Sequence, residues 1–253
     1  MNEQEFLSRI RRGLARTPRS FGGLMDDHVA AIRRHAASAG NAGAAGTGEG
    51  AGADARADEQ PRDEGPGLLD EFTREFEALG GHAWVAGGPG EALELMVRAL
   101  REILARRGGY ACLAAHPLLE AWGVEAALRD ARLDVRVYRS VADLTVLAGC
   151  EVSVTVAGGA IAETGTLVME SHPYQGRLAS LLAPVHVGIV PPNGLMPSVA
   201  AWLADRETRF GGGEEMPSSV AFATGPSRSA DIPGDLALGV HGPGEVHAVL
   251  IRA

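Results

Sequence analysis

One carboxylate in the middle of the chain stands out because of its neighbours. Glu163 lies in the run AETGT, between a valine-rich run at 152–156 and a second apolar run that begins at Leu167. Valines alternate there with serine and threonine, which is the period of a β-strand, so Glu163 is predicted to lie between two strands. A carboxylate beside a β core is costly to desolvate without partners, which makes Glu163 a candidate nucleophile or general base. The alternative is that it only accepts hydrogen bonds from backbone N–H groups of a turn.

The residues that follow Glu163 are small or carry hydroxyl groups. Thr164 and Thr166 place hydroxyls beside the carboxylate, and Gly165 lets the backbone turn or approach a ligand closely. We therefore predict that Thr164, Gly165 and Thr166 bind substrate.

A second polar cluster, TGPSRSADI, follows a strand-like run near the C-terminus. Its glycine and proline indicate a turn. Backbone N–H groups, the Ser227 hydroxyl and the Arg228 guanidinium together suit a phosphate or a carboxylate. The predicted substrate-binding residues are Gly225, Ser227, Arg228 and Asp231. Alternatively, Ser227 caps a helix and Arg228 pairs with Asp231 inside the fold.

A histidine lies in the last turn of the chain. His241 begins the sequence HGPG, just before a final strand-like run. Histidine side chains can act as general acids and bases, so His241 is a second catalytic candidate, although a lone histidine more often has a structural role.

Strands and helices alternate along the part of the chain that must position these residues. Apolar residues recur at helical spacing in 68–79, 91–106 and 118–131, and strand-like runs lie between and after them. This alternation predicts an α/β fold with a mostly parallel sheet and helices on both faces. In such folds ligands bind outside the carboxyl ends of the strands.

Composition limits the class of protein. The chain has 253 residues, a formal net charge of −9 and 45% hydrophobic residues, which favours a globular protein and argues against nucleic acid as a partner. No apolar run is long enough to insert into a membrane. Cys112 and Cys150 lack the spacing of a metal or redox pair, so we expect two buried thiols, no metal, no bound cofactor and a cytoplasmic protein.

Three regions are expected. Residues 1–39 form an N-terminal helical arm, in which an amphipathic helix at 3–16 either grips a partner or presents a solvated basic face. Residues 40–67 are Gly-, Ala- and acid-rich and are predicted to be a flexible linker. Residues 68–253 form the α/β domain.

Four motifs carry a resemblance to a known family: AIAETGTLVMES, SLLAPVHVGIV, ATGPSRSADI and LGVHGPGEVHAVLI. Together with FLSRIRRGLAR at the N-terminus, they resemble the lactate utilization protein C family, whose LUD domain was formerly described as YkgG-like. The resemblance implies an α/β fold related to the sugar isomerase and coenzyme A transferase-like superfamily. It also implies a role beside iron–sulfur proteins in oxidising lactate to pyruvate. Acyl-transferring members of that superfamily use a glutamate in a similar place, followed by Asn where this chain has Thr164.

Two functions follow from these observations. The chain has no cysteine set for an iron–sulfur cluster, no P-loop and no dinucleotide-binding fingerprint, so electron transfer is expected to belong to partner proteins. In the first hypothesis the protein is a non-redox component of a lactate-oxidising system and binds a small anionic ligand. In the second it is an enzyme of the isomerase or acyl-transferase type that uses Glu163 and an anion site at Ser227 and Arg228.

Overall fold

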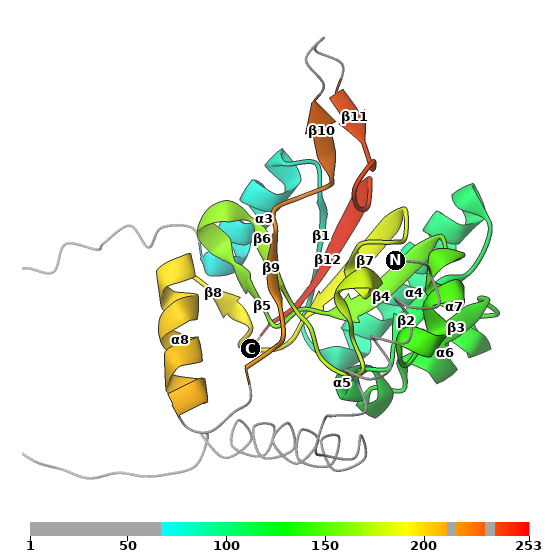
Figure 1. Cartoon of the computed structure of the whole chain (residues 1–253), viewed down its shortest axis with the longest axis horizontal. Helices are drawn as coiled ribbons and strands as arrows, with labels where there is room; N and C mark the ends of the chain where they lie inside the picture. Colours follow the sequence, from blue (N-terminus) through cyan, green and yellow to red (C-terminus); the bar gives the residue numbers. More distant parts are fainter. Residues whose placement is uncertain (1–66, 212–215, 231–235, 253) are drawn as a thin grey trace, which may run out of the picture. The chain divides into compact units, whose positions relative to one another are not determined.

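The computed structural model describes residues 67–211, 216–230 and 236–252, drawn in colour in Figure 1. The predicted arm at 1–39, nearly all of the predicted linker at 40–67, and Asp231 lie outside these residues. The helices are α3 (Leu68–Ala78), α4 (Pro89–Arg107), α5 (Pro117–Ala121), α6 (Val124–Asp130), α7 (Leu144–Ala148), α8 (Val199–Gly211) and the short 3-10 turns η1 (Val141–Asp143), η2 (Ala162–Thr164) and η3 (Arg177–Ser180).

The strands belong to three sheets. The large sheet contains β1 (His82–Ala86), β2 (Ala111–Ala114), β3 (Val135–Tyr138), β4 (Val152–Val156), β7 (Val185–Val190) and β12 (Glu245–Ile251). The small sheet contains β5 (Gly159–Ile161), β6 (Thr166–Glu170), β8 (Leu195–Met196) and β9 (Val220–Ala223). The third is the hairpin of β10 (Arg228–Ala230) and β11 (Leu236–Leu238), which extends away from the two sheets in Figure 1.

The large sheet confirms the predicted α/β architecture. Its order is β1-β12-β7-β4-β2-β3, and every neighbouring pair is parallel. Central strands such as β4 and β7 are buried at every position, because secondary structure covers both faces. The relation to a particular superfamily stays an expectation.

Each face of the large sheet has its own core. On one face, valines of β4 and β7 pack with buried residues of α4 and α6, such as Leu100 and Leu128. On the other face, Phe72 and Phe76 of α3 and Leu167 of β6 cover Ala248 and Leu250 of β12. The small sheet and α3 therefore form the second covering layer. None of the helices in the described part of the chain combines the length and the apolar character that crossing a membrane would need.

The small sheet was not predicted as a separate sheet, and two glycines explain how it arises. After β4 the chain leaves the large sheet through Gly158 and Gly159, and β5 then pairs antiparallel with β6. A Cβ on residue 158 would lie 2.7 Å from Cγ of Glu170, and one on residue 159 would lie 3.1 Å from the Gly194 carbonyl oxygen. The glycine pair thus permits close packing of the protein's own elements rather than only the approach of a ligand.

The connections of the large sheet reverse direction between β2 and β4. The chain leaves β2 toward β3 at one edge, whereas it leaves β4 toward β7 and the opposite edge. The crevice outside the carboxyl ends of two such strands is the usual ligand position in open α/β sheets.

Candidate functional site

Glu163 lies in η2, between β5 and β6. The predicted strand at 152–156 is β4, and the unpredicted strand β5 lies between it and Glu163. The Glu163 side chain is exposed, and Oε1 accepts a hydrogen bond from the backbone N–H of Val199, the first residue of α8, at 3.0 Å. A carboxylate at this position stabilises a helix N-terminus through the unpaired N–H groups of the first turn. The arrangement matches the structural alternative for Glu163, and it also fixes the carboxylate on the surface. The catalytic role stays a prediction.

The AETGT and TGPSR motifs meet through three hydroxyl groups. Antiparallel pairing of β6 with β9 brings residues that lie 58 positions apart in the sequence side by side. Oγ1 of Thr166 lies 2.7 Å from Oγ1 of Thr164 and 2.8 Å from Oγ1 of Thr224. We call Thr164, Thr166 and Thr224 the threonine junction. Thr224 was not among the predicted site residues, and only the strand pairing identifies it.

Both motifs also pack on the C-terminal part of α3. Gly165 has φ 57°, and a Cβ there would lie 2.7 Å from the Glu75 carbonyl carbon, so no larger residue fits without movement. Gly225 has φ 82° and lies against Leu79. The Arg228 guanidinium donates a hydrogen bond to the Leu79 carbonyl oxygen, which places this exposed side chain on the same end of α3.

Ser227 and Arg228 lie on an extended segment rather than at a helix. The Ser227 N–H donates to the Pro243 carbonyl oxygen at 2.8 Å, and the Ser227 carbonyl accepts from the Gly239 N–H at 3.0 Å. Arg228 then begins β10. The alternative in which Ser227 caps a helix is therefore wrong, because backbone pairing with 239–243 holds the segment extended. Asp231 lies outside the described residues, so the pairing of Arg228 with Asp231 stays a prediction.

His241 is exposed in the turn between β11 and β12, at the amino end of β12. Within the described ranges, no hydrogen bond or ion pair joins Glu163 to His241, Ser227 or Arg228. The structure therefore brings Thr164, Gly165 and Thr166 together with Gly225 and Arg228 around the end of α3, and it leaves His241 on another element.

A further cluster of ionisable and aromatic groups lies beyond the end of β6, and the sequence analysis did not identify it. Glu170 and Arg206 are 8% and 4% exposed, and Oε1 of Glu170 lies 2.6 Å from Nη2 of Arg206. Arg206 also donates to the Gly158 carbonyl oxygen at 2.7 Å. Nε2 of His172 lies 3.7 Å from the other carboxylate oxygen of Glu170. The buried charges are therefore paired, as a buried carboxylate requires.

Aromatic contacts connect this cluster to β2. The Tyr174 ring stacks on His172 at 5.2 Å between centroids and meets His116 edge-on at 5.0 Å. His116 follows β2, and its Nδ1 accepts a hydrogen bond from the Leu118 N–H at the start of α5. Burial, and secondly the charge of Glu170, raise the pKa of the Tyr174 hydroxyl, so this residue stays protonated at neutral pH.

Gln175 fixes the loop after β6 to the carboxyl end of β4. Its side-chain amide accepts from the Val156 N–H at 2.9 Å and donates to the Val156 carbonyl oxygen at 2.7 Å. Gln175 is buried, so both bonds form away from water. His116, Tyr174 and Gln175 thus lie where the sheet topology places a ligand crevice. In the sequence, the spacing of Glu170, His172 and Tyr174 at every second position could have indicated a polar cluster at this edge. Arg206 lies far from them in the sequence, and only the fold brings it to Glu170.

Three residues at the opposite, amino edge of the sheet are close enough to hold a metal ion. The ligand atoms of His82, Glu245 and His247 lie within 4.8 Å of one another. However, Nδ1 of His247 accepts a hydrogen bond from the Trp84 indole N–H at 3.2 Å, and Nε2 lies 2.9 Å from Oε1 of Glu245. A neutral histidine that binds metal through Nε2 must carry its proton on Nδ1, where the Trp84 donor already points. This arrangement fits a neutral histidine that donates to Glu245 and does not fit a metal ligand.

Comparison with known proteins places these sites in a family context. The LUD domain family model matches residues 69–251, which include every site residue described above. Lactate utilization protein C of Halalkalibacterium halodurans is 38% identical over 93 residues, covering 37% of this chain and 40% of that protein. The protein of the same name from Geobacillus kaustophilus is 31% identical over 150 residues, covering 56% and 62%. That from Bacillus subtilis is 36% identical over 100 residues, covering 40% and 42%.

The aligned region spans less than two thirds of each of these relatives. Among solved structures, a DUF162 family protein from Deinococcus radiodurans aligns with a TM-score of 0.49 at 18% identity, covering 73% of this chain and 96% of that one. The family match covers most of the chain and confirms the resemblance of the four motifs. The chain belongs to the LUD domain family.

Proposed function

We propose that this protein is a non-redox component of a lactate-utilisation system and that it binds a small carboxylate at the threonine junction. The observation that carries the proposal is the hydroxyl contact between Thr166 and Thr224, which joins the two motifs predicted to bind substrate. The names of the relatives, lactate utilization protein C, supply the metabolic context.

The groups around the junction suit an anion. Arg228 lies on a segment adjacent to the junction, and its side chain is exposed. Hydroxyl groups can donate to a carboxylate while a guanidinium supplies the opposite charge, and such charge-assisted bonds contribute more than neutral ones. The closeness of the three threonine oxygens makes this a preorganised set of donors and acceptors.

The electrons of lactate oxidation are assigned to partner proteins. An iron–sulfur cluster is held by about four thiolates, whereas the chain has 2 cysteines. Both are buried, and Cys150 Sγ donates to the Leu147 carbonyl oxygen at 3.1 Å. In this proposal, iron–sulfur proteins of the same system accept the electrons, and the LUD protein contributes a carboxylate-binding surface.

The proposal is tested by purification from the native source. We expect iron-containing proteins to co-purify with the affinity-tagged chain. The co-purified material should reduce a dye acceptor when lactate is added. The isolated chain should be colourless and inactive with the same dye. Lactate oxidation by the isolated chain, or a tagged chain that recovers neither iron nor lactate-dependent activity, would contradict the proposal.

A second candidate function is an isomerase or acyl transferase that uses Glu163. The observation that favours it is an exposed carboxylate held by one oxygen on the Val199 N–H, while Oε2 makes no bond to another described residue. One oxygen would thus be fixed and the other available as nucleophile or base.

Glu163→Gln distinguishes a chemical role from a structural one. Glutamine keeps an oxygen that can accept from Val199 but loses the negative charge, so the melting temperature should change little. Complementation of a deletion strain on lactate then gives the answer, with Arg101→Gln on α4 as a matched surface control. Growth equal to wild type would leave Glu163 as a helix-capping residue, whereas loss of growth with a folded protein would support chemistry.

A further inference from the structure

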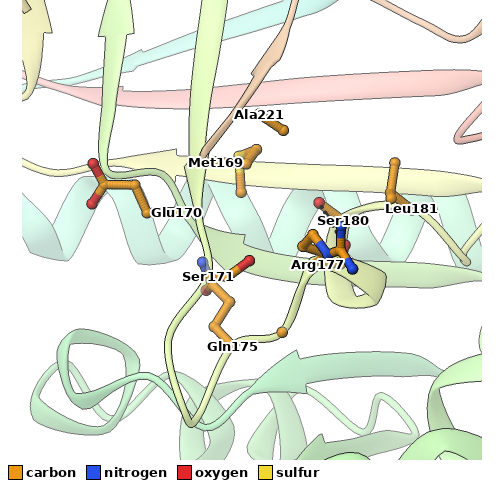
Figure 2. Close-up of a pocket in the computed structure, with 9 residues that line it drawn as sticks. Met169, Glu170, Ser171, Gln175, Arg177, Ser180, Leu181 and Ala221 are labelled. Atoms are coloured by element: carbon orange, nitrogen blue, oxygen red, sulfur yellow. Dashed lines mark hydrogen bonds between the residues drawn. The ribbon is translucent and has the colours of Figure 1, made fainter. Parts of the chain in front are cut away.

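A hollow opens between the small sheet and η3, next to the carboxyl end of β4. It encloses about 330 Å³ of empty space, counting the part open to solvent. The lining includes Met169, Ser171, Arg177, Ser180, Leu181 and Ala221 (Figure 2).

The position of the hollow is fixed by buried contacts. Gln175 lines it and is bonded to both backbone groups of Val156, so the loop 171–176 cannot move independently of the large sheet. The Ser171 N–H donates to the Ser219 carbonyl oxygen at 2.9 Å, which ties the same loop to the segment before β9. The hollow is therefore a built feature of two packed sheets.

The charge inside the hollow is that of a single cation. Arg177 is exposed, and within the described ranges its guanidinium forms no ion pair. Glu170 also borders the hollow, but its carboxylate is neutralised by Arg206 and points to the other side of β6 from Met169 in Figure 2. One uncompensated positive charge beside a neutral pair favours a monoanion over a phosphate dianion.

The remaining lining groups are polar on one side of the hollow and apolar on the other, so they suit a ligand with one polar end and one apolar end. Ser171 points across the hollow toward Arg177 and Ser180 in Figure 2. Ser180 Oγ donates to the Arg177 carbonyl oxygen at 3.1 Å and keeps its lone pairs as acceptors. Met169 and Leu181 supply an apolar wall that a short alkyl group could contact.

We propose that this hollow binds a short-chain 2-hydroxy or 2-oxo monocarboxylate. Arg177 pairs with the carboxylate, the Ser171 hydroxyl donates to the oxygen on the adjacent carbon, and Met169 and Leu181 contact the alkyl group. Ser180, whose proton is donated to the Arg177 carbonyl, can accept from the hydroxyl of a 2-hydroxy acid. The choice of these acids as probes rests on the proposed role in lactate utilisation, whereas the site itself rests on the lining residues.

The hollow is a neighbour of the predicted anion turn but is distinct from it. A Cβ on Gly242 would lie 3.3 Å from Cβ of Ser227 and 3.8 Å from Cδ2 of Leu181. Ser227 of the predicted anion turn and Leu181 of the hollow therefore both lie close to Gly242. Arg177 and Arg228 nevertheless lie on different elements. Variants of these two arginines can therefore separate the two sites.

The test is calorimetric titration of the full chain with L-lactate, pyruvate and propionate. Wild type is compared with Arg177→Gln, Ser171→Ala, Arg228→Gln and the control Arg101→Gln. Loss of one charge-assisted contact corresponds to about tenfold or more in affinity. We expect Arg177→Gln to weaken L-lactate and pyruvate binding by that factor, Arg101→Gln to leave it unchanged, and propionate to bind more weakly because it lacks the second oxygen. Arg228→Gln reports the separate contribution of the threonine junction.

Three outcomes would overturn this inference. They are no saturable binding by wild type at millimolar concentrations, affinity that Arg177→Gln does not change, and affinity lost only in Arg228→Gln. The last result would move the carboxylate to the threonine junction and would support the proposed function while removing the hollow as its site. Circular dichroism of each variant confirms folding, and Ser171→Ala provides a second, smaller change should Arg177→Gln fold poorly.

Discussion

Acidification should destabilise this protein through a histidine buried between the large sheet and the small sheet. His186 of β7 is 1% exposed, and its Nε2 lies 2.8 Å from Oγ1 of Thr155 on β4. Leu167 of β6 covers the neighbouring Gly188, so the small sheet excludes water from this position. Burial, and secondly the nearby His247, lower the pKa of His186 to about 4.

The sign and size of the effect follow from proton linkage. The unfolded chain binds a proton on His186 near pH 6.5, whereas the folded protein does so only near pH 4, so stability is complete above pH 6.5 and falls as the pH drops between these values. At about 1.4 kcal/mol per pH unit the full interval corresponds to about 3 kcal/mol, of which about 2 kcal/mol is lost by pH 5. Burial also lowers the pKa of His247, which adds to the loss in the same direction.

Equilibrium urea unfolding at several pH values from 7.5 to 5 measures this loss. In His186→Gln, whose amide can still bond Thr155, the difference in unfolding free energy between the two end points should shrink by about 2 kcal/mol. His241→Gln, at an exposed histidine, is the matched control and should keep the wild-type pH dependence. Equal pH dependence in His186→Gln and wild type would refute the reasoning, as would an NMR titration in which the His186 ring protonates near pH 6.5.

Three further predictions concern the packing that holds the sites. Gly165→Ala should lower the unfolding free energy by about 2–4 kcal/mol, because residue 165 has a positive φ and lies against the backbone of Glu75. Gly90→Ala, in open space at the start of α4, should instead raise the unfolding free energy by about 0.4–1 kcal/mol. Urea unfolding compares the two variants, and equal effects would contradict the packing argument. Gln175→Ala should cost about 2–5 kcal/mol by leaving the N–H and carbonyl of Val156 unpaired, and a melting temperature like that of wild type would count against this. The two buried cysteines should react with a thiol reagent only after unfolding, and rapid labelling of the native protein would show that they are accessible.

The sequence predicted the large sheet because its signals are long and periodic. The alternation in 152–156 and the helical spacing in 91–106 each match one element, β4 and α4. The small sheet escaped prediction because β5 and β8 contain 3 and 2 residues, too few for a period to be visible. Its existence depends on the turn at Gly158 and on pairing between distant segments, which no local pattern contains.

The candidate sites divide in the same way. Glu163 was predicted to lie between two strands, and it does, because glycine and threonine after an apolar run indicate a turn. Thr224 and Arg206 were not identified, since their neighbours Thr166 and Glu170 are brought to them only by pairing of β6 with β9 and by packing of α8. A residue whose role depends on a distant partner leaves no signal in its own sequence neighbourhood.

The strand β6 connects three polar regions of this domain. Thr166 at its start belongs to the threonine junction, Met169 lines the hollow, and Glu170 at its end holds Arg206. Every residue of β6 is buried, and antiparallel partners flank it on both sides. Because close-packed strands move as units, we expect a ligand in the hollow to affect the junction through the position of the whole strand. Adjacent residues of this short strand, such as Met169 and Glu170, point to opposite faces. A substitution in β6 that alters carboxylate binding must therefore be assigned with Arg177 and Arg228 variants rather than from β6 alone.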